Sequence, residues 1–190
     1  NKFIDNKNVQ KFICDINKNL KIIGISSNGK VLQINWRENI NTEYKLDKKV
    51  LGNIDPKEIV NFHNLNNNIK NYLCVLSSDG HFKKVLFDDD MMNSNRIFSI
   101  TKLKNCAKIV DSFIYVQEEK FVILTSIGRI FKFDLSNKFL NPSTKQSQGF
   151  LLVNLLPTEE IVSCCKSKDK DILYLVSKKG KFFKLKIDDI

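Results

Sequence analysis

The sequence predicts an all-β fold built from four copies of one repeat of about fifty residues. In each copy an apolar run leads to Ser or Thr, two variable residues, Gly, a basic residue or His, and a second apolar run. Helical periodicity is absent, and the chain contains only 3 prolines, too few for a linker. The copies read KIIGISSNGKVLQINW, NYLCVLSSDGHFKKVLF, KFVILTSIGRIFKFDL and DILYLVSKKGKFFKLKI. Repeats of this kind build an extended surface more often than a single catalytic pocket.

Each copy is expected to form a β-hairpin whose turn carries the glycine. The four glycines are Gly29, Gly80, Gly128 and Gly180. Asn-Gly and Asp-Gly, which occupy the first two turns, are the strongest local hairpin signals because both residues tolerate positive φ. A small hydroxyl residue stands three positions before each glycine, where the first arm ends. These residues are Ser26, Ser77, Thr125 and Ser177.

A weaker apolar element lies roughly twenty residues upstream of each hairpin glycine. These elements are Val9–Ile13, Ile59-Val60, Ile109-Val110 and Ile161-Val162. With the two hairpin arms they give three or four strands per repeat, the size of one blade in a radial β architecture. Four such units fill the 190 residues, so the sequence predicts a single repeat domain spanning residues 1–190. Because no initiator Met or targeting segment is visible, we expect this chain to be a fragment of a longer one.

The net charge of +10 and a pI near 9.3 favour an anionic partner. The chain is also rich in Asn, Lys and Ile, as an AT-rich genome would encode, and this bias supplies part of the lysine content. The positions of the cations carry more information, because they recur after each glycine and would form a stripe along the edge of a disc. The candidate phosphate ligands are Lys30, Lys83, Lys84, Arg129, Lys132, Lys181 and Lys184, with the loop residues Arg37, Arg96 and Lys145.

The sequence contains no catalytic motif of the phosphate-binding-loop or nucleophile-elbow type. The two histidines have no partner at metal-ligand spacing, so no metal site is predicted. The 5 cysteines include no CxxC pair, which favours reduced thiols in an intracellular compartment. The longest apolar stretch is too short to cross a bilayer, so no membrane partner is predicted.

Three stretches of the second half of the chain carry a further pattern, and they read KFVILTSIGRIFKFDLSN, QSQGFLLVNLLPTEEIVSC and DILYLVSKKGKFFKLKIDDI. Through them the chain resembles the C-terminal domain of the DNA gyrase A subunit, most strongly between Lys120 and Ile190. The segment Gly149–Pro157 fits a second element of the family repeat, and Val50–Pro56 looks like a degraded copy of it. The resemblance implies a β-pinwheel, a propeller-like disc whose blades exchange strands and whose basic outer edge wraps double-stranded DNA.

The resemblance also implies partners and cofactors for a whole type IIA topoisomerase. These are a gyrase B-type ATPase subunit and the chain's own cleavage core, with ATP and Mg²⁺ in the holoenzyme and no cofactor in this fragment. The fragment itself would be non-catalytic, because none of its tyrosines follows an arginine as the family's cleavage dyad requires. The holoenzyme would control DNA supercoiling.

Two features depart from the family. Only four copies are visible where the family has six, and the Gln-basic-basic-Gly-Gly-Lys-Gly box of gyrases is missing, which leaves a gyrase or a topoisomerase IV-like role open. The alternative from a different class is a propeller-type protein-interaction scaffold such as an RCC1-like protein, although its repeats are richer in Gly than a chain with 7. Asn- and Lys-rich insertions such as His63–Lys70 favour the plastid-like organelle (apicoplast) of an apicomplexan parasite, with the cytoplasm as the other expected compartment.

Overall fold

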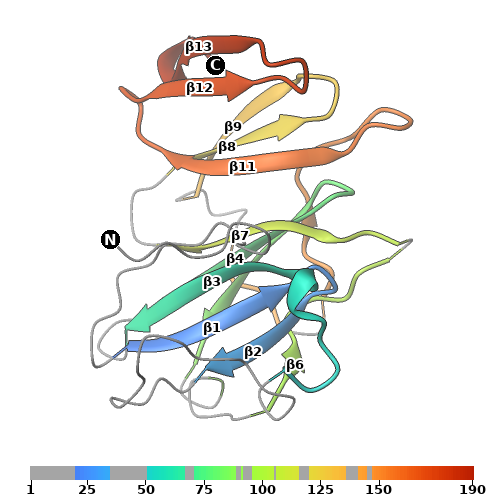
Figure 1. Cartoon of the computed structure of the whole chain (residues 1–190). Helices are drawn as coiled ribbons and strands as arrows, with labels where there is room; N and C mark the ends of the chain where they lie inside the picture. The colour runs from blue at the N-terminus through green and yellow to red at the C-terminus, as the bar shows by residue number, and fades with distance from the viewer. Residues whose placement is uncertain are drawn as a thin grey trace, which may run out of the picture.

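A computed structural model describes residues 20–34, 51–66, 71–88, 91, 96–104, 106–115, 120–135, 141–144 and 147–190. It confirms the predicted all-β fold, because the described residues form four antiparallel sheets. Figure 1 shows these sheets as a stack, with the N-terminal sheet at the bottom of the view and the C-terminal one at the top. The predicted element Val9–Ile13 and the candidate ligands Arg37 and Lys145 lie outside the described residues.

All four predicted hairpins are present. Their strands are β1 (Leu20–Ser26) with β2 (Lys30–Ile34), β4 (Asn71–Ser77) with β5 (His81–Phe87), β8 (Lys120–Thr125) with β9 (Ile130–Asp134), and β12 (Ile172–Val176) with β13 (Phe182–Lys186). In every turn the glycine N–H donates to the carbonyl of the hydroxyl residue three positions earlier, over 2.9–3.1 Å. Each of these glycines has a φ between +75° and +87°, the left-handed conformation that the sequence pattern predicted.

The upstream elements form strands that complete the preceding hairpin, and we call them the exchanged strands. β3 (Ile59–Asn66) pairs with β1, β7 (Ile109–Tyr115) with β4, and β11 (Ile161–Ser167) with β8. Each exchanged strand therefore leads directly into one hairpin along the chain while it pairs with the hairpin before it. This is the strand exchange that the family resemblance implied.

Short strands after the second and third hairpins also reach back to the previous repeat. β6 (Phe98–Ser99) pairs with β2, and β10 (Phe150–Leu151), inside the predicted segment Gly149–Pro157, pairs with β5. The sheet orders are β3-β1-β2-β6, β10-β5-β4-β7, β11-β8-β9 and β12-β13. The two four-stranded sheets have the upper number of the predicted three or four strands, but two consecutive repeats contribute them.

The apolar core lies between neighbouring sheets and behind the first one. Phe82 of β5 packs on Phe121 of β8 with ring centroids 5.0 Å apart, which joins the second blade to the third. Leu51 and Ile54 pack against the first sheet in a cluster that includes Leu32. The described part of the degraded copy, residues 51–56, forms no strand, because a turn leads into the 3₁₀ helix η1 (Pro56–Glu58), which Asp55 caps. A second 3₁₀ helix, η3 (Ile187–Asp189), ends the chain.

None of the helices that the described residues form has the length and apolar character needed to cross a membrane.

We expect Gly80→Ala to destabilise the protein far more than Gly180→Ala. Both positions have positive φ, so either alanine carries about 1–2 kcal/mol of backbone strain. A Cβ at Gly80 would also lie 2.4 Å from the carbonyl oxygen of Val153, whereas the described residues leave the space around a Cβ at Gly180 open. This clash should raise the loss for Gly80→Ala by about 1–3 kcal/mol in urea unfolding. Equal losses would contradict the docking of residues 152–153 on the second turn.

Candidate nucleic-acid interface

The repeated hydroxyl residue fixes the backbone from which each turn cation emerges. Ser26 Oγ accepts a hydrogen bond from the N–H of Lys30 at 3.0 Å, and Ser177 Oγ accepts one from Lys181 at the same distance. Thr125 Oγ1 binds the N–H of Arg129 at 3.1 Å in the third turn. The Ser/Thr-x-x-Gly-basic motif is therefore a turn in which side-chain and main-chain bonds hold the position after the glycine. In Figure 1 the turns that follow β1, β8 and β12 lie on the same side of the stack.

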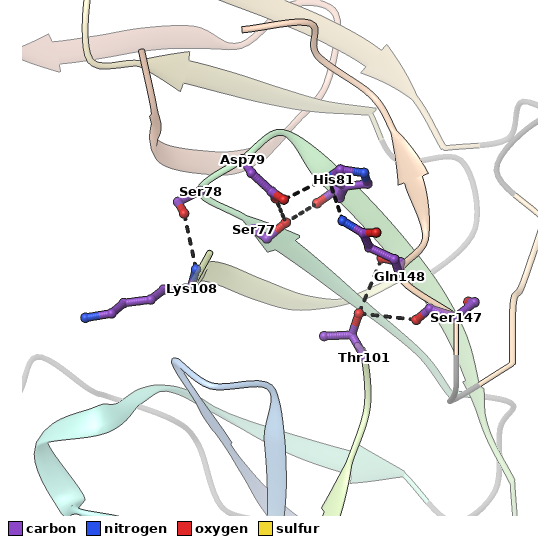
Figure 2. Close-up of polar contacts among 8 residues, drawn as sticks. All are labelled: Ser77, Ser78, Asp79, His81, Thr101, Lys108, Ser147 and Gln148. Atoms are coloured by element: carbon purple, nitrogen blue, oxygen red, sulfur yellow. Dashed lines mark hydrogen bonds and ion pairs between the residues drawn. The ribbon is translucent and has the colours of Figure 1, made fainter. Parts of the chain in front are cut away.

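Two segments, which we call linkers, connect consecutive turns. The first linker, residues 100–108, begins where Ile100 N–H donates to the Gly29 carbonyl and ends where the Lys108 carbonyl accepts from Ser78 N–H, both at 2.8 Å. The second linker, residues 152–160, runs in the same way from the Gly80 carbonyl to Ser126 N–H. Figure 2 shows Lys108 beside Ser78, with its side chain extending away from the turn. Cations on a linker are therefore held next to those on the turns.

The first linker is basic and lies beside a predicted turn cation. Lys102, Lys104 and Lys108 are all exposed, and Lys30 on the adjoining turn is half-buried. We call these four residues the first basic cluster. The three linker lysines were not among the predicted cations, because they fall outside the repeated motif. The run KLKNCAK, with three cations in seven residues, was the available signal.

The second linker is acidic, and its Glu159 neutralises the charge of Arg129 on the third turn. Arg129 donates to both carboxylate oxygens of the buried Glu159, through Nε at 2.8 Å and through Nη2, which also reaches the Asn154 carbonyl at 3.0 Å. These bonds lower the pKa of Glu159 to about 2, so the carboxylate stays charged at neutral pH. The guanidinium also lies over the Phe131 ring, 5.1 Å from its centroid. The Arg129 guanidinium is thus held by Glu159 and the Asn154 carbonyl, and the predicted basic stripe is interrupted at the third turn.

Lys83 and Lys84 do not lie on an exposed edge, and their prediction as surface cations is wrong. Lys83 is 1% exposed and its Nζ donates to the Ser147 carbonyl at 2.6 Å. Lys84 is 8% exposed, with its Nζ 4.0 Å from the centroid of the Tyr115 ring and 5.1 Å from that of Tyr72. Strand alternation leaves one side of a sheet in solvent only where nothing covers it. Here the neighbouring repeats cover both sides of β5.

Burial lowers the pKa of Lys83 from 10.5 to about 8, which predicts a pH-dependent stability. Between those pH values the unfolded chain binds more protons than the folded one, so the free energy of unfolding should rise with pH across this window. Below pH 8 the folded protein carries the full cost of a buried ammonium. The stability of the natural chain relative to Lys83→Met should therefore increase from pH 8 to 10 in urea unfolding. Lys102→Met, which removes an exposed lysine, is the control, and parallel curves for all three proteins would contradict the burial of Lys83.

The remaining predicted cations are divided between a buried contact and an exposed hairpin. Lys132 is half-buried and its Nζ donates to the Ile187 carbonyl at 2.9 Å, so it joins the third repeat to the fourth. Lys181 and Lys184 are exposed on the fourth hairpin, and Arg96 is exposed ahead of β6. The second basic cluster consists of Lys178, Lys179, Lys181, Lys184 and Lys186, all exposed.

Polar side chains of the exchanged strands bind one another beside a cavity of about 510 Å³. Asn61 Nδ2 donates to Asp111 Oδ1 at 2.5 Å, and His63 Nε2 lies 2.8 Å from Ser112 Oγ. Burial, with the charge of Lys166, lowers the pKa of His63 to about 4, so its imidazole is neutral at physiological pH. These pairs tie β3 to β7. Across the described residues, no three His, Cys, Asp or Glu side chains gather as metal ligands would.

Several solved structures share this fold, and three of them are described below, whereas no family model and no curated protein matches the sequence. The C-terminal domain of a DNA topoisomerase IV superposes with a TM-score of 0.75 at 18% identity, over 92% of this chain and 55% of its own. A DNA gyrase A C-terminal domain gives 0.70 at 20% identity, over 92% and 57%. The E. coli ParC C-terminal domain gives 0.67 at 14%, over 90% and 71%. This chain therefore spans little more than half the length of the first two, and the likeness confirms the β-pinwheel fold.

Proposed function

We propose that this chain is a DNA-binding and DNA-wrapping module of a gyrase-like type IIA topoisomerase. The observation that carries the proposal is the first basic cluster, held at consecutive hairpin turns of a β-pinwheel. The similar structures are domains of DNA gyrase and DNA topoisomerase IV, and the net charge of +10 is suited to a polyanion.

Lysine side chains in the two basic clusters would meet DNA phosphates as point charges. Such contacts hold and orient a duplex without reading its bases. Smooth bending of 20–30 bp costs about 1–6 kcal/mol, so contacts from several repeats are needed to offset it. Because Arg129 is bound to Glu159, the duplex would be held at two separate patches, one on the first basic cluster and one around Lys181. Arg96, and the predicted cations Arg37 and Lys145, would add contacts from loops.

Control of DNA topology would be a property of the proposed holoenzyme. There the module would present a bent duplex to the cleavage core of its own chain, while a gyrase B-type subunit would bind ATP and Mg²⁺. The compartment that fits the Asn- and Lys-rich composition is an apicoplast. Support for this assembly comes from the family resemblance and the shared fold alone.

The proposed function is tested by duplex binding across a salt series. We expect the affinity of the chain for a duplex of about 30 bp to fall steeply between about 50 and 200 mM salt, with log K dropping by about 0.9 per log salt for each phosphate neutralised. Absence of binding at moderate salt would overturn the proposal and favour a protein-interaction scaffold.

A further inference from the structure

Hydrogen-bond donors from the third turn and the second linker converge on the carboxylate of Glu159. Arg129 Nε donates to Oε1 at 2.8 Å, and Nη2 donates to Oε2. The N–H of Leu156 reaches Oε2 at 2.8 Å, and the Thr125 hydroxyl binds the same carboxylate. A guanidinium fork with a backbone N–H and a hydroxyl is also a donor set that suits a phosphate group. The third turn therefore holds an anion site, and the chain's own carboxylate fills it.

The Arg129 guanidinium has supports that do not involve Glu159. It lies over the Phe131 ring, 5.1 Å from the centroid, and its Nη2 donates to the Asn154 carbonyl at 3.0 Å. Thr125 Oγ1 accepts from the Arg129 N–H at 3.1 Å and fixes the backbone. The Glu159 side chain is fully buried, whereas that of Arg129 is 35% exposed. Without the carboxylate, the guanidinium should keep its place and present its donors to solvent.

The fold of the linker does not require an acidic residue at position 159. The first linker has Ala107 at the equivalent position. In both linkers the N–H of this residue donates to the carbonyl three residues earlier, at 2.9 and 3.0 Å. In both, the residue just before it is a non-glycine residue with positive φ, Cys106 at 62° and Thr158 at 66°. The carboxylate is thus an addition to a shared linker conformation, placed beside the one turn cation that is an arginine.

We propose that Glu159 occupies a phosphate site at the third turn and so keeps duplex DNA away from that turn. Arg129 directly follows its turn glycine, as Lys30 and Lys181 of the two basic clusters do. The third hairpin lies between the sheets of the second and fourth in Figure 1, so the filled site stands between the clusters. Glu159 is then a positioning residue that acts through Arg129 and divides the basic edge into two patches. The part of this inference that concerns DNA rests on the proposed function.

The second linker should stay docked when Glu159 is replaced. Main-chain bonds hold both of its ends, from Leu152 N–H to the Gly80 carbonyl at 2.9 Å and from Ser126 N–H to the Glu160 carbonyl at 2.8 Å. Glu159→Ala gives this position the residue that the first linker has there. Glu160→Ala is the matched control, because it removes the same charge from the neighbouring, exposed residue and leaves the anion site filled.

Inorganic phosphate tests the site without DNA. When phosphate replaces chloride at equal ionic strength, the melting temperature of Glu159→Ala should rise by about 2–4 °C more than that of Glu160→Ala, because the anion binds the folded state. The excess should vanish when Arg129→Ala is added to Glu159→Ala. Equal responses of the two single variants would overturn the proposal. Glu159→Gln, which keeps the shape of the side chain, should show a smaller excess, and no excess in either Glu159 variant would overturn it as well.

Duplex binding tests the role of Glu159 toward DNA. The slope of log K against log salt should be steeper by about 0.9 for Glu159→Ala than for Glu160→Ala, because one more phosphate is neutralised. Equal slopes would overturn the proposal and leave the proposed function standing. If Glu159→Ala responds to inorganic phosphate while neither it nor the natural chain binds DNA, the proposed function fails and the phosphate site stands.

Discussion

Replacing all four lysines of the first basic cluster with glutamate should lower duplex-DNA affinity by at least about a hundredfold near 150 mM salt. The cluster consists of Lys30, Lys102, Lys104 and Lys108. Loss of four phosphate contacts should also reduce the slope of log K against log salt by about 3.6, at 0.9 per contact. Fluorescence anisotropy with a labelled duplex measures both quantities. An unchanged affinity and slope would show that DNA binds elsewhere on the protein.

A matched pair of double variants separates position from net charge. Lys102→Glu with Lys104→Glu changes the first linker, whereas Lys168→Glu with Lys170→Glu changes the loop between β11 and β12. Both pairs of lysines are exposed and both variants lose the same charge. The linker variant should bind DNA several-fold more weakly than the loop variant, because direct contacts contribute more than the general field of the protein.

Phe82→Ala should reduce the free energy of unfolding by about 3–5 kcal/mol, the cost of a large cavity in a packed core. The Phe82 ring is fully buried and lies 5.0 Å from the ring centroid of Phe121 and 6.4 Å from that of Phe113. Its loss would loosen the contact between the second and third blades. Urea unfolding followed by circular dichroism measures the effect.

Phe182→Ala is the control, since Phe182 is the equivalent residue of the fourth hairpin and is 64% exposed. In residues 1–190 this substitution should cost less than about 1 kcal/mol. If both substitutions lowered the free energy of unfolding by similar amounts, Phe82 and Phe182 would not differ in burial in the folded protein as described.

The four hairpins could be predicted from the sequence because their determinants are local. A glycine at positive φ and a hydroxyl three residues earlier define each turn, and both were visible as a repeated motif. The strand exchange was harder to predict from the sequence. The pair Ile109-Val110 precedes the third hairpin, and nothing in these residues shows that their strand pairs with β4 of the second hairpin. That part of the fold was expected only from the family resemblance.

The candidate site was predicted less well than the hairpins. Whether a cationic side chain is exposed depends on contacts with residues that are distant in the sequence. Lys83 and Lys84 were assigned to the edge of the disc because they follow the repeated glycine, but stacked sheets cover both sides of β5. Arg129 is neutralised by Glu159, thirty residues along the chain, on a linker that lies outside the hairpin motif. The lysines of the first linker were missed for the converse reason: only the docking of that linker between two turns places them beside Lys30.

The wrapping role is tested by the topology of a relaxed DNA circle that is religated in the presence of this chain. Wrapping around the stacked blades should change the linking number in proportion to the protein bound, and the variant with four glutamates in the first basic cluster should not change it at the same concentration. Saturating binding by the natural chain with an unchanged linking number would contradict the wrapping role.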